Sequence, residues 1–284
     1  MCPPSSIRKV SYRNQRWPSL GIETLWFSDL RDRVPQGYFT RPERRDFHIL
    51  MLCTAGTGLH HVDFSRIELH RGVVLHVHPG QVLQHSFEGD MEARLALFLP
   101  EFLGPEGHSA DAPSPLSLEE PEFQALERAF AELQEEYEQT DGSPLSMGLL
   151  QHLLEAFLLR MNRVARFEGA SPRGNPSQME LLRLFRRELE ASFRQSREVA
   201  HYARRLGYSA RTLDRAAMAL EDLSAKALID GRVVLEAKRL LVHTQEPVGT
   251  IARHLGFSEA TNFAKFFRKG AGCSPTAFRD RMVG

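Results

Sequence analysis

Hydrophobic residues follow a different period in each half of the chain. Between Phe47 and Leu99, short apolar runs such as FHILMLC and ARLALFL alternate with frequent turn signals, which is typical of an antiparallel sandwich or small barrel. Pro79-Gly80 suits the centre of a type II turn, so a strand should end at His78. From Pro121 onward, the apolar positions take helical spacing. The pattern therefore predicts an α+β chain.

Two helices are expected directly after the strands. The first begins behind Pro121 and carries apolar residues at i, i+3, i+7 and i+10. The second opens near Ser143-Pro144 and has an apolar stripe from Leu149 to Met161 that is broad for a helix covered along one line. Packing onto the first helix and the sheet explains such a stripe, and so does a homodimer contact. Both explanations stay open at this point.

The last third of the chain contains an internal repeat. VAHYARRLGYSARTLDRAAM (199–218) aligns with VGTIARHLGFSEATNFAKFF (248–267) at an offset of 49, which becomes 50 in the later pairs. Between the copies, DGRVVLEAKRLLVHT (230–244) predicts a connecting helix. Two copies are too few for a solenoid. The repeat indicates a duplicated helical module joined by a helix.

Each copy has the residues that a helix-turn-helix requires. Ala203 and Ala252 are small enough for two short helices to approach, and Gly207 and Gly256 permit the left-handed turn between them. The serine two residues after each glycine is expected to cap the following helix through its hydroxyl. That following helix is the one normally laid in the major groove of DNA.

The expected DNA contacts lie at the start and along the exposed side of the second helix in each copy. Polar and basic side chains there can reach base edges and phosphates, although for each one a solvated helix face is the alternative. The candidates are Ser209, Ala210, Arg211, Thr212 and Arg215 in the first copy, and Ser258, Glu259, Thr261, Asn262, Lys265, Arg268 and Lys269 in the second. The last three are expected to contact phosphate.

Charge is unevenly distributed along a chain with 36 basic and 36 acidic residues. From Pro176 onward there are 19 Lys and Arg against 12 Asp and Glu, a net charge of +7, which leaves −7 for the remainder. A basic half favours a polyanion such as double-stranded DNA as partner. The sequence has no signal peptide and no long apolar run, so we expect a cytoplasmic protein without a membrane partner. Three widely spaced cysteines indicate neither disulfides nor a zinc cluster.

The segment TIARHLGFSEATNFAKFFRKGAGCSPTAFR resembles the carboxy-terminal signature of the AraC/XylS family of bacterial transcription regulators. The resemblance covers about 105 residues, 178–281, including the connecting helix. The first copy departs from the family pattern, with Ala217 for an aromatic residue, Asp222 for glycine and Ala225 for proline. An Asp tolerates unusual backbone conformations. The missing aromatic has to be compensated by neighbours such as Met218 or Leu220.

The resemblance implies a sequence-specific DNA-binding transcription regulator whose two modules occupy successive major grooves. It further implies a cupin-like antiparallel β-barrel with two helices (residues 1–167) that senses a small-molecule effector and dimerises, a linker (168–177), and an all-α domain with two helix-turn-helix modules and a linker helix (178–284). An activator would also contact RNA polymerase. The sequence leaves open whether the target genes are activated or repressed.

Five residues of the barrel region are candidates for binding an effector. They are Trp26, Tyr38, His60, His78 and His85. For the aromatic residues, packing in the core is the main alternative. The ligand itself cannot be read from the sequence.

A metal-dependent cupin enzyme with an appended DNA-binding domain is the rival interpretation. Cupins often bind metal through a His-x-His pair, a Glu and a later His, and the rings of His76 and His78 should share one face of a strand. However, His60 and His61 fall on opposite faces, and no Glu follows at the enzyme spacing. We therefore expect no metal, no cofactor and no catalytic residue. The rival requires a metal that is lost on mutating His76, His78 and His85.

Overall fold

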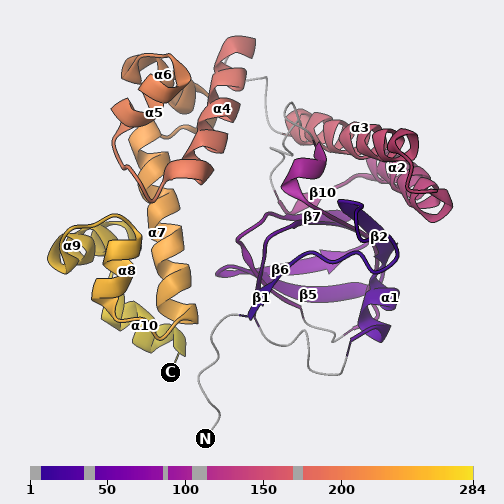
Figure 1. Cartoon of the computed structure of the whole chain (residues 1–284), viewed down its shortest axis with the longest axis horizontal. Helices are drawn as coiled ribbons and strands as arrows, with labels where there is room; N and C mark the ends of the chain where they lie inside the picture. Colours follow the sequence, from indigo (N-terminus) through magenta and orange to yellow (C-terminus); the bar gives the residue numbers. More distant parts are fainter. Residues whose placement is uncertain (1–7, 35–41, 86–88, 104–113, 169–174, 284) are drawn as a thin grey trace, which may run out of the picture. The chain divides into compact units, whose positions relative to one another are not determined.

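The computed structural model describes residues 8–34, 42–85, 89–103, 114–168 and 175–283, in two compact units (Figure 1). The amino-terminal unit comprises residues 7–171, and most of the other unit is residues 172–284. The expected start of the DNA-binding domain at residue 178 lies inside helix α4 (Pro176–Ser192). This helix begins earlier because the Asn175 side chain caps it, accepting a hydrogen bond from the Gln178 amide at 2.9 Å.

Two five-stranded sheets form the amino-terminal unit, as the α+β prediction requires. The first has the order β1 (Arg8–Val10), β3 (Glu43–Arg45), β8 (Val82–His85), β5 (Thr57–Val62) and β6 (Ser65–His70). The second has the order β10 (Leu116–Ser117), β7 (Val73–Val77), β4 (His48–Ala55), β9 (Glu92–Phe98) and β2 (Ile22–Trp26). Among the described strands, β1 pairs with β3 in parallel and the other pairings are antiparallel. Strand β7 ends at Val77, and the Gln81 amide donates to the His78 carbonyl across the predicted turn.

Strand β4 contributes to two separate hydrophobic cores because its side chains alternate between the faces of the second sheet. Ile49, Met51 and Cys53 belong to the core that includes residues of both sheets. Leu50 and Leu52 belong to the core formed with helices α2 (Glu120–Gln139) and α3 (Pro144–Glu168). The two helices therefore cover the outer face of the second sheet (Figure 1). A short helix α1 (Phe27–Asp32) follows β2, and a 3₁₀ turn (Pro100–Leu103) follows β9.

Helices α2 and α3 confirm the apolar patterns predicted from the sequence. The four predicted α2 residues are buried, namely Phe123, Leu126, Phe130 and Leu133. Along α3 the buried side chains are Leu150, Leu154, Phe157, Leu158 and Met161. Leu145, Leu149 and Leu159 are 84%, 45% and 46% exposed. Packing within the unit therefore explains only part of the broad stripe.

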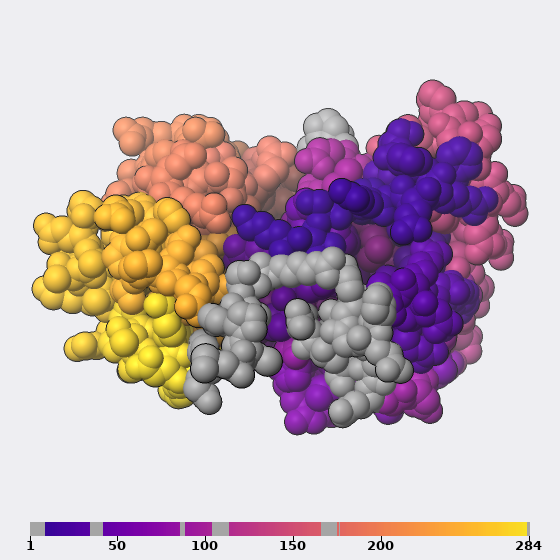
Figure 2. Space-filling model, turned by 60° about the horizontal axis from the view of Figure 1, so that its bottom comes forward, coloured from indigo at the N-terminus to yellow at the C-terminus, as the bar shows by residue number. Residues whose placement is uncertain are grey.

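The carboxy-terminal unit consists of helices among the described residues and confirms the two predicted modules. After α4, the first module contains α5 (Val199–Leu206) and α6 (Ala210–Glu221), and the connecting helix is α7 (Ala225–His243). The second module contains α8 (Val248–His254) and α9 (Ala260–Ala271), followed by α10 (Pro275–Val283). Figure 2 shows the surfaces of the two modules in salmon and yellow. The connecting helix starts a turn earlier than predicted because Ser224 caps it.

The two turn glycines have the left-handed conformation that the repeat predicts. Gly207 and Gly256 both have φ of +75°. In each turn, the amide of the residue after the glycine donates to the carbonyl of the matched alanine of the repeat, Ala203 or Ala252, at 2.9 Å. Their surroundings differ, because a Cβ on Gly256 would lie 2.5 Å from the Arg194 carbonyl oxygen, whereas a Cβ on Gly207 would meet nothing within 4 Å.

The predicted serine caps are half right. The Ser209 hydroxyl accepts from the Thr212 amide at 3.0 Å and caps α6. For Ser258 the prediction is wrong, because α9 begins one residue later and its capping position is Glu259, which makes no side-chain capping bond. The extra residue in the second copy shifts the helix start away from the serine.

The first module has Ala217, which is fully buried, where the family pattern has an aromatic residue. Met218 is 47% exposed, so the expectation that Met218 fills the space is wrong, whereas Leu220, the other expected neighbour, is half-buried. The large buried rings near α6 are Phe185 of α4 and Tyr202 of α5, whose centroids lie 5.5 Å apart. Asp222 has φ of +53° and adopts the left-handed conformation of the glycine it replaces.

We predict that Gly256→Ala destabilises the protein more than Gly207→Ala. Both variants place an L side chain in the left-handed region, which costs about 1–2 kcal/mol. Only the Gly256 variant also forces a methyl group against the Arg194 carbonyl. Urea unfolding of both variants measures the difference, and equal losses would contradict the close contact at Gly256.

Candidate DNA-binding face and effector cavity

Helix α6 buries one side and exposes the side on which the DNA contacts were predicted. Leu213, Ala216 and Ala217 are buried, whereas Arg211 and Arg215 are exposed. Ser209 and Ala210 are exposed as well. Thr212 is half-buried, and its hydroxyl lies 2.7 Å from that of Ser209. Thr212 therefore takes part in the cap, while the two arginines extend into solvent.

Helix α9 has the same arrangement with different side chains. Phe263 and Phe267 are buried, and their rings belong to a chain of aromatic contacts that also includes Phe257 and Phe278. The predicted contacts are all exposed: Ser258, Glu259, Thr261, Asn262, Lys265, Arg268 and Lys269. The Thr261 hydroxyl donates to the Glu259 carboxylate at 3.2 Å. The exposed side of α9 is thus polar at its start and basic toward its end.

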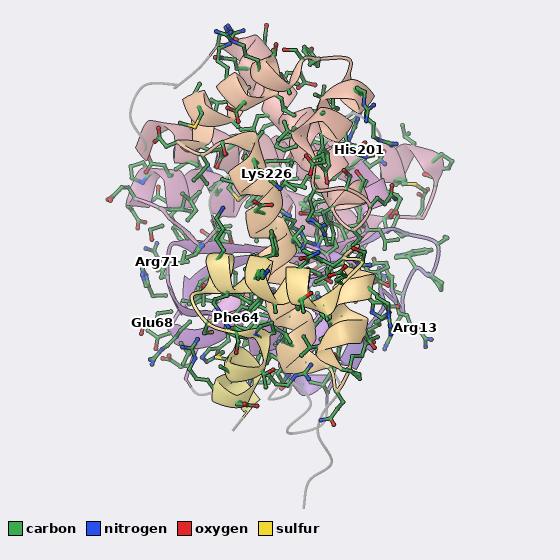
Figure 3. All side chains as sticks on the ribbon, turned by 90° about the vertical axis from the view of Figure 1, so that its left-hand side faces the viewer. Arg13, Phe64, Glu68, Arg71, His201 and Lys226 are labelled. Atoms are coloured by element: carbon green, nitrogen blue, oxygen red, sulfur yellow. The ribbon has the colours of Figure 1, made fainter. Side chains whose placement is uncertain are left out.

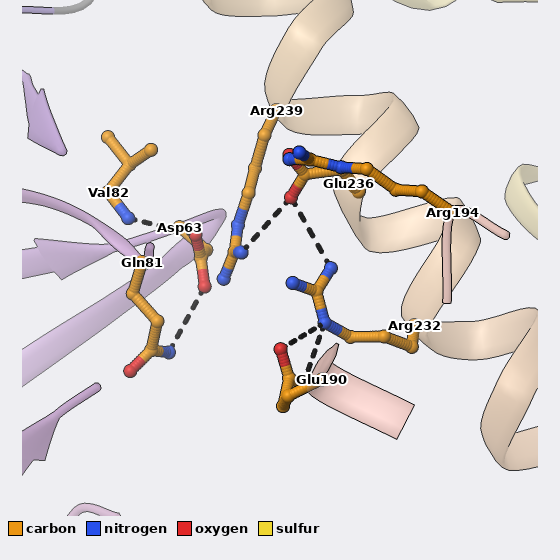
Figure 4. A network of polar contacts seen from close by, with 8 residues as sticks. All are labelled: Asp63, Gln81, Val82, Glu190, Arg194, Arg232, Glu236 and Arg239. Atoms are coloured by element: carbon orange, nitrogen blue, oxygen red, sulfur yellow. Dashed lines mark hydrogen bonds and ion pairs between the residues drawn. The ribbon is translucent and has the colours of Figure 1, made fainter. Parts of the chain in front are cut away.

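The buried carboxylate of Glu236 joins α4 to the connecting helix (Figure 4). Its oxygens lie 2.9 Å from Arg194, 3.3 Å from Arg232 and 3.4 Å from Arg239. Arg232 also bonds both carboxylate oxygens of Glu190, on α4, through Nε at 2.8 and 3.0 Å. A buried carboxylate is stable only when paired in this way. The network fixes where α4 meets α7.

A second set of contacts connects the start of the first module to the turn of the second. The Arg197 guanidinium lies 3.6 Å from the centre of the Phe257 ring and donates to the Leu255 carbonyl at 3.3 Å. Lys226, labelled in Figure 3, donates to the Arg197 carbonyl at 3.0 Å and pairs with Asp230 at 2.8 Å. The two modules are therefore linked by side-chain contacts as well as by α7.

The barrel region contains a cavity of about 600 Å³, a size typical of small-molecule sites. Its apolar lining comes mainly from β2, β4 and β9 and includes Leu25, Phe47, Ile49, Met51, Leu95 and Leu97. Its polar lining includes Lys9, Arg13, Glu23, Arg33, Glu43, Arg45 and His85. Arg45 pairs with Glu43 at 2.8 Å, and Arg33 pairs with Glu23 at 2.9 Å.

Of the five residues predicted to bind an effector, His85 lines this cavity. Trp26 does not line it, because the Trp26 ring packs against the Arg94 guanidinium at 4.3 Å. His60 is buried beside His85, with ring centroids 4.8 Å apart, but does not line the cavity. His78 belongs to another cluster, and Tyr38 lies outside the described residues.

The charged residues of the cavity are not among those predicted from the sequence to bind an effector. Glu43 and Arg45 alternate on the short strand β3, so that both side chains share one face, and both are buried. The charged stretch RPERRD reads as an exposed loop when taken alone. Only the pairing of β3 with β8 shows that part of it is a strand at the cavity.

The barrel histidines form two clusters on different sheets. His48, His76 and His78 offer ring nitrogens within 4.8 Å of one another, and His48 Nδ1 lies 3.0 Å from His76 Nε2. His76 and His78 have ring centroids 4.1 Å apart, as their alternating spacing predicted. His85 pairs with His60 on the first sheet. The set required by the enzyme interpretation, His76, His78 and His85, is therefore not brought together.

Burial keeps four of these imidazoles neutral. Desolvation lowers the pKa of His60 to about 4 and holds the pKa of His85 well below its usual value, with His60 and Arg45 adding to the effect on His85. In the other cluster, desolvation lowers the pKa of His48 to about 3 and that of His76 well below its usual value. At neutral pH all four rings lack charge.

Two domain families match separate parts of the chain. The AraC-like ligand binding domain matches residues 29–157, and the helix-turn-helix domain matches residues 202–281. Among the described residues, no helix has the length and apolarity needed to cross a bilayer.

Two transcriptional activators are similar to this chain over most of their length. The activator RhaR of Mannheimia succiniciproducens is 24% identical over 253 residues, which is 84% of this chain and 87% of the relative. The activator RhaS of an Enterobacter species is 24% identical over 262 residues, 88% of this chain and 91% of the relative. Among solved structures, ToxT from Vibrio cholerae covers 93% of this chain and 99% of that one, with 11% identity and a TM-score of 0.41.

A β-barrel unit with a ligand-binding-domain match and a unit with two helix-turn-helix modules define a DNA-binding transcription regulator with an amino-terminal ligand-binding domain. The ligand-binding match is AraC-like, and both relatives are transcriptional activators of the helix-turn-helix type. The chain belongs to the AraC/XylS family.

We predict that acid destabilises the amino-terminal unit through His60 and His85. Their pKa values are lower in the folded than in the unfolded protein, so the unfolded state binds more protons below about pH 6.5, and stability falls as pH falls. Between about pH 7.5 and 5.5, His60 should remove roughly 1 kcal/mol of stability, and His85 should change stability in the same direction.

Unfolding in urea at the two pH values measures this loss. In His60→Gln, the free energy of unfolding should change less between the two pH values than in the unmodified protein. His61→Gln alters an exposed neighbour and is the control, because its free energy of unfolding should change as much as that of the unmodified protein. An unchanged difference in His60→Gln would contradict a neutral, buried His60.

Proposed function

We propose that α6 and α9 enter successive major grooves of promoter DNA and that an organic effector in the barrel cavity controls this binding. The observation that carries the proposal is the pair of matched modules, each with a buried apolar side and an exposed polar side, joined through α7. Contacts of Glu236 and Arg197 hold the parts of this unit in a fixed arrangement. A regulator of this kind acts where the promoter DNA lies, in the cytoplasm.

Different side chains have different roles in this proposal. Arg211 and Asn262 lie on the first turn of α6 and α9, where side chains of a helix in the major groove meet base edges. Lys265, Arg268 and Lys269 follow one or two turns later and contact phosphates. About five to eight phosphate contacts would make the logarithm of affinity fall with the logarithm of salt concentration at a slope near −5 to −7.

We predict that Arg211→Lys and Lys265→Ala weaken DNA binding in different ways. Arg211→Lys keeps the charge but loses the guanidinium group that can donate two hydrogen bonds to one base. It should therefore reduce the preference for the selected sequence by about 1–3 kcal/mol and leave the salt dependence of affinity unchanged. Lys265→Ala should weaken binding to all sequences and make the salt slope shallower by about 1.

The test starts with selection of bound duplexes from a random pool, followed by affinity measurements on the selected site and on a scrambled site. Arg66→Ala on β6 is the control, because this exposed residue also carries a positive charge but belongs to the barrel unit. Selection that returns no preferred sequence would overturn the proposal. An unchanged preference in Arg211→Lys would remove Arg211 from the reading residues.

We infer that the protein is a homodimer that activates transcription together with RNA polymerase. The relatives RhaR and RhaS are named as activators, which supports activation rather than repression. Leu145, Leu149 and Leu159 leave an apolar strip on α3 that packing within the unit does not cover. A second copy of the chain would bury this strip.

The effector proposed for the cavity is a small organic anion with an apolar part. The apolar wall is continuous along β4 and β9, where Ile49 and Met51 pair with Leu97 and Leu95. Two of the four basic lining residues are balanced by Glu23 and Glu43, which leaves a net charge of +2 on the polar side of the lining. Such a ligand would place its apolar part against the strands and its anionic group toward the basic lining residues.

We predict that Leu97→Trp abolishes ligand binding without abolishing DNA binding. The larger side chain fills part of the cavity, while the DNA contacts lie in the other unit. A panel of aliphatic and aromatic carboxylates is tested for raising the melting temperature and for changing affinity for the selected DNA site. Arg128→Trp on α2, outside the cavity lining, is the control. A carboxylate that acts equally on Leu97→Trp would place its site elsewhere.

A further inference from the structure

Three histidines meet on the face of the second sheet that packs against α2 and α3, away from the effector cavity. His48 opens β4, while His76 and His78 lie at the end of β7 and directly after it. His76 is fully buried, and the other two are half-buried. One ring nitrogen of each lies within 4.8 Å of the other two. None of the three is among the residues that line the cavity.

Contacts outside the cluster hold each histidine in place. The His48 ring stacks on Phe98, with centroids 4.7 Å apart and an angle of 5° between the planes. The His76 amide donates to the Ser114 hydroxyl at 2.8 Å. The His78 amide donates to the Gln81 side chain at 2.7 Å, and Gln81 in turn donates to Asp63 at 3.1 Å (Figure 4). The cluster is therefore positioned before any ligand arrives.

The cluster leaves hydrogen-bonding capacity unused where the core is otherwise apolar. His48 Nδ1 and His76 Nε2 are 3.0 Å apart and share one hydrogen bond. His76 Nδ1 is buried and has no hydrogen-bond partner within the described part of the chain. Buried polar atoms are normally paired, so a water molecule or a bound ion at this cluster would account for the unused capacity. Apolar side chains would fill this place without that cost.

We propose that His48, His76 and His78 bind a divalent transition-metal ion of the zinc class. Neutral imidazoles are the preferred nitrogen ligands of such ions. Three protein ligands leave a fourth position for water or another small ligand, as in open zinc sites. Zn–N bonds of about 2.0–2.1 Å bring tetrahedral ligand nitrogens to about 3.3 Å from one another, so a small contraction of the cluster suffices.

This site differs from the metal interpretation considered from the sequence. That interpretation grouped His76 and His78 with His85, which lies on the other sheet. His48 takes its place because β4 pairs with β7 in antiparallel register, with Ile49 opposite Val77. A bound ion would join the beginning of β4 to the end of β7 and to the turn at Gln81. The proposal holds whether or not the barrel cavity binds an effector.

Zinc binding to the full-length protein, prepared without a histidine tag, tests the proposal. The protein competes with a chromogenic chelator for Zn²⁺, and Co²⁺ absorption reports the ligand geometry. We expect one equivalent of Zn²⁺ to bind, and we expect affinity to fall at least tenfold in His48→Gln and in His78→Gln. His61→Gln and His152→Gln are matched controls at exposed positions and should bind as the unmodified protein does.

Folding is checked separately, because the variants alter partly buried residues. Circular dichroism and melting temperature in the presence of a chelator should be close to those of the unmodified protein. Added Zn²⁺ should raise the melting temperature of the unmodified protein by several degrees but not that of His78→Gln. Absence of binding at micromolar Zn²⁺, or binding that survives both His48→Gln and His78→Gln, would overturn the proposal. Neither outcome depends on DNA binding.

Discussion

The buried carboxylate of Glu236 is the interaction on which the arrangement of the DNA-binding unit depends. It lies on the connecting helix and meets guanidinium groups from α7 itself and from the segment after α4. Because an unpaired charge in this place would be strongly destabilising, the network is formed or lost as a whole. The proposed binding to successive grooves requires a fixed spacing between the two modules, and this network, together with the contact of Arg197 with the Phe257 ring, supports such a spacing.

The two modules reach similar shapes through different side chains. The second module has a core of phenylalanines, whereas the first buries Ala217 and draws its large rings from α4 and α5. The second turn has less space around its glycine, since the Arg194 carbonyl lies against Gly256. The same carbonyl belongs to a residue of the Glu236 network, so the turn of the second module is tied to the connection with α4. Duplication therefore preserved the outline of the module and changed how each copy is supported.

In the amino-terminal unit, one sheet serves two purposes because its side chains alternate. One face of β4 lines the cavity with Ile49 and Met51. The other face carries Leu50 and Leu52 into the core with α2 and α3, and His48 into the histidine cluster. The cavity and the histidine cluster thus lie on opposite faces of one sheet and share the backbone of β4.

The sequence by itself determined the α+β class, the duplicated modules, the turn glycines and the exposed sides of α6 and α9. These features depend on local periodicity and on backbone conformations that few residues adopt, so they can be read along the chain. Tertiary structure alone decided the cavity and the histidine cluster. Glu43 and Arg45 line the cavity because β3 pairs with β8, and His48 meets His76 because β4 pairs with β7. Such contacts depend on strand pairing between distant segments, which no local pattern encodes.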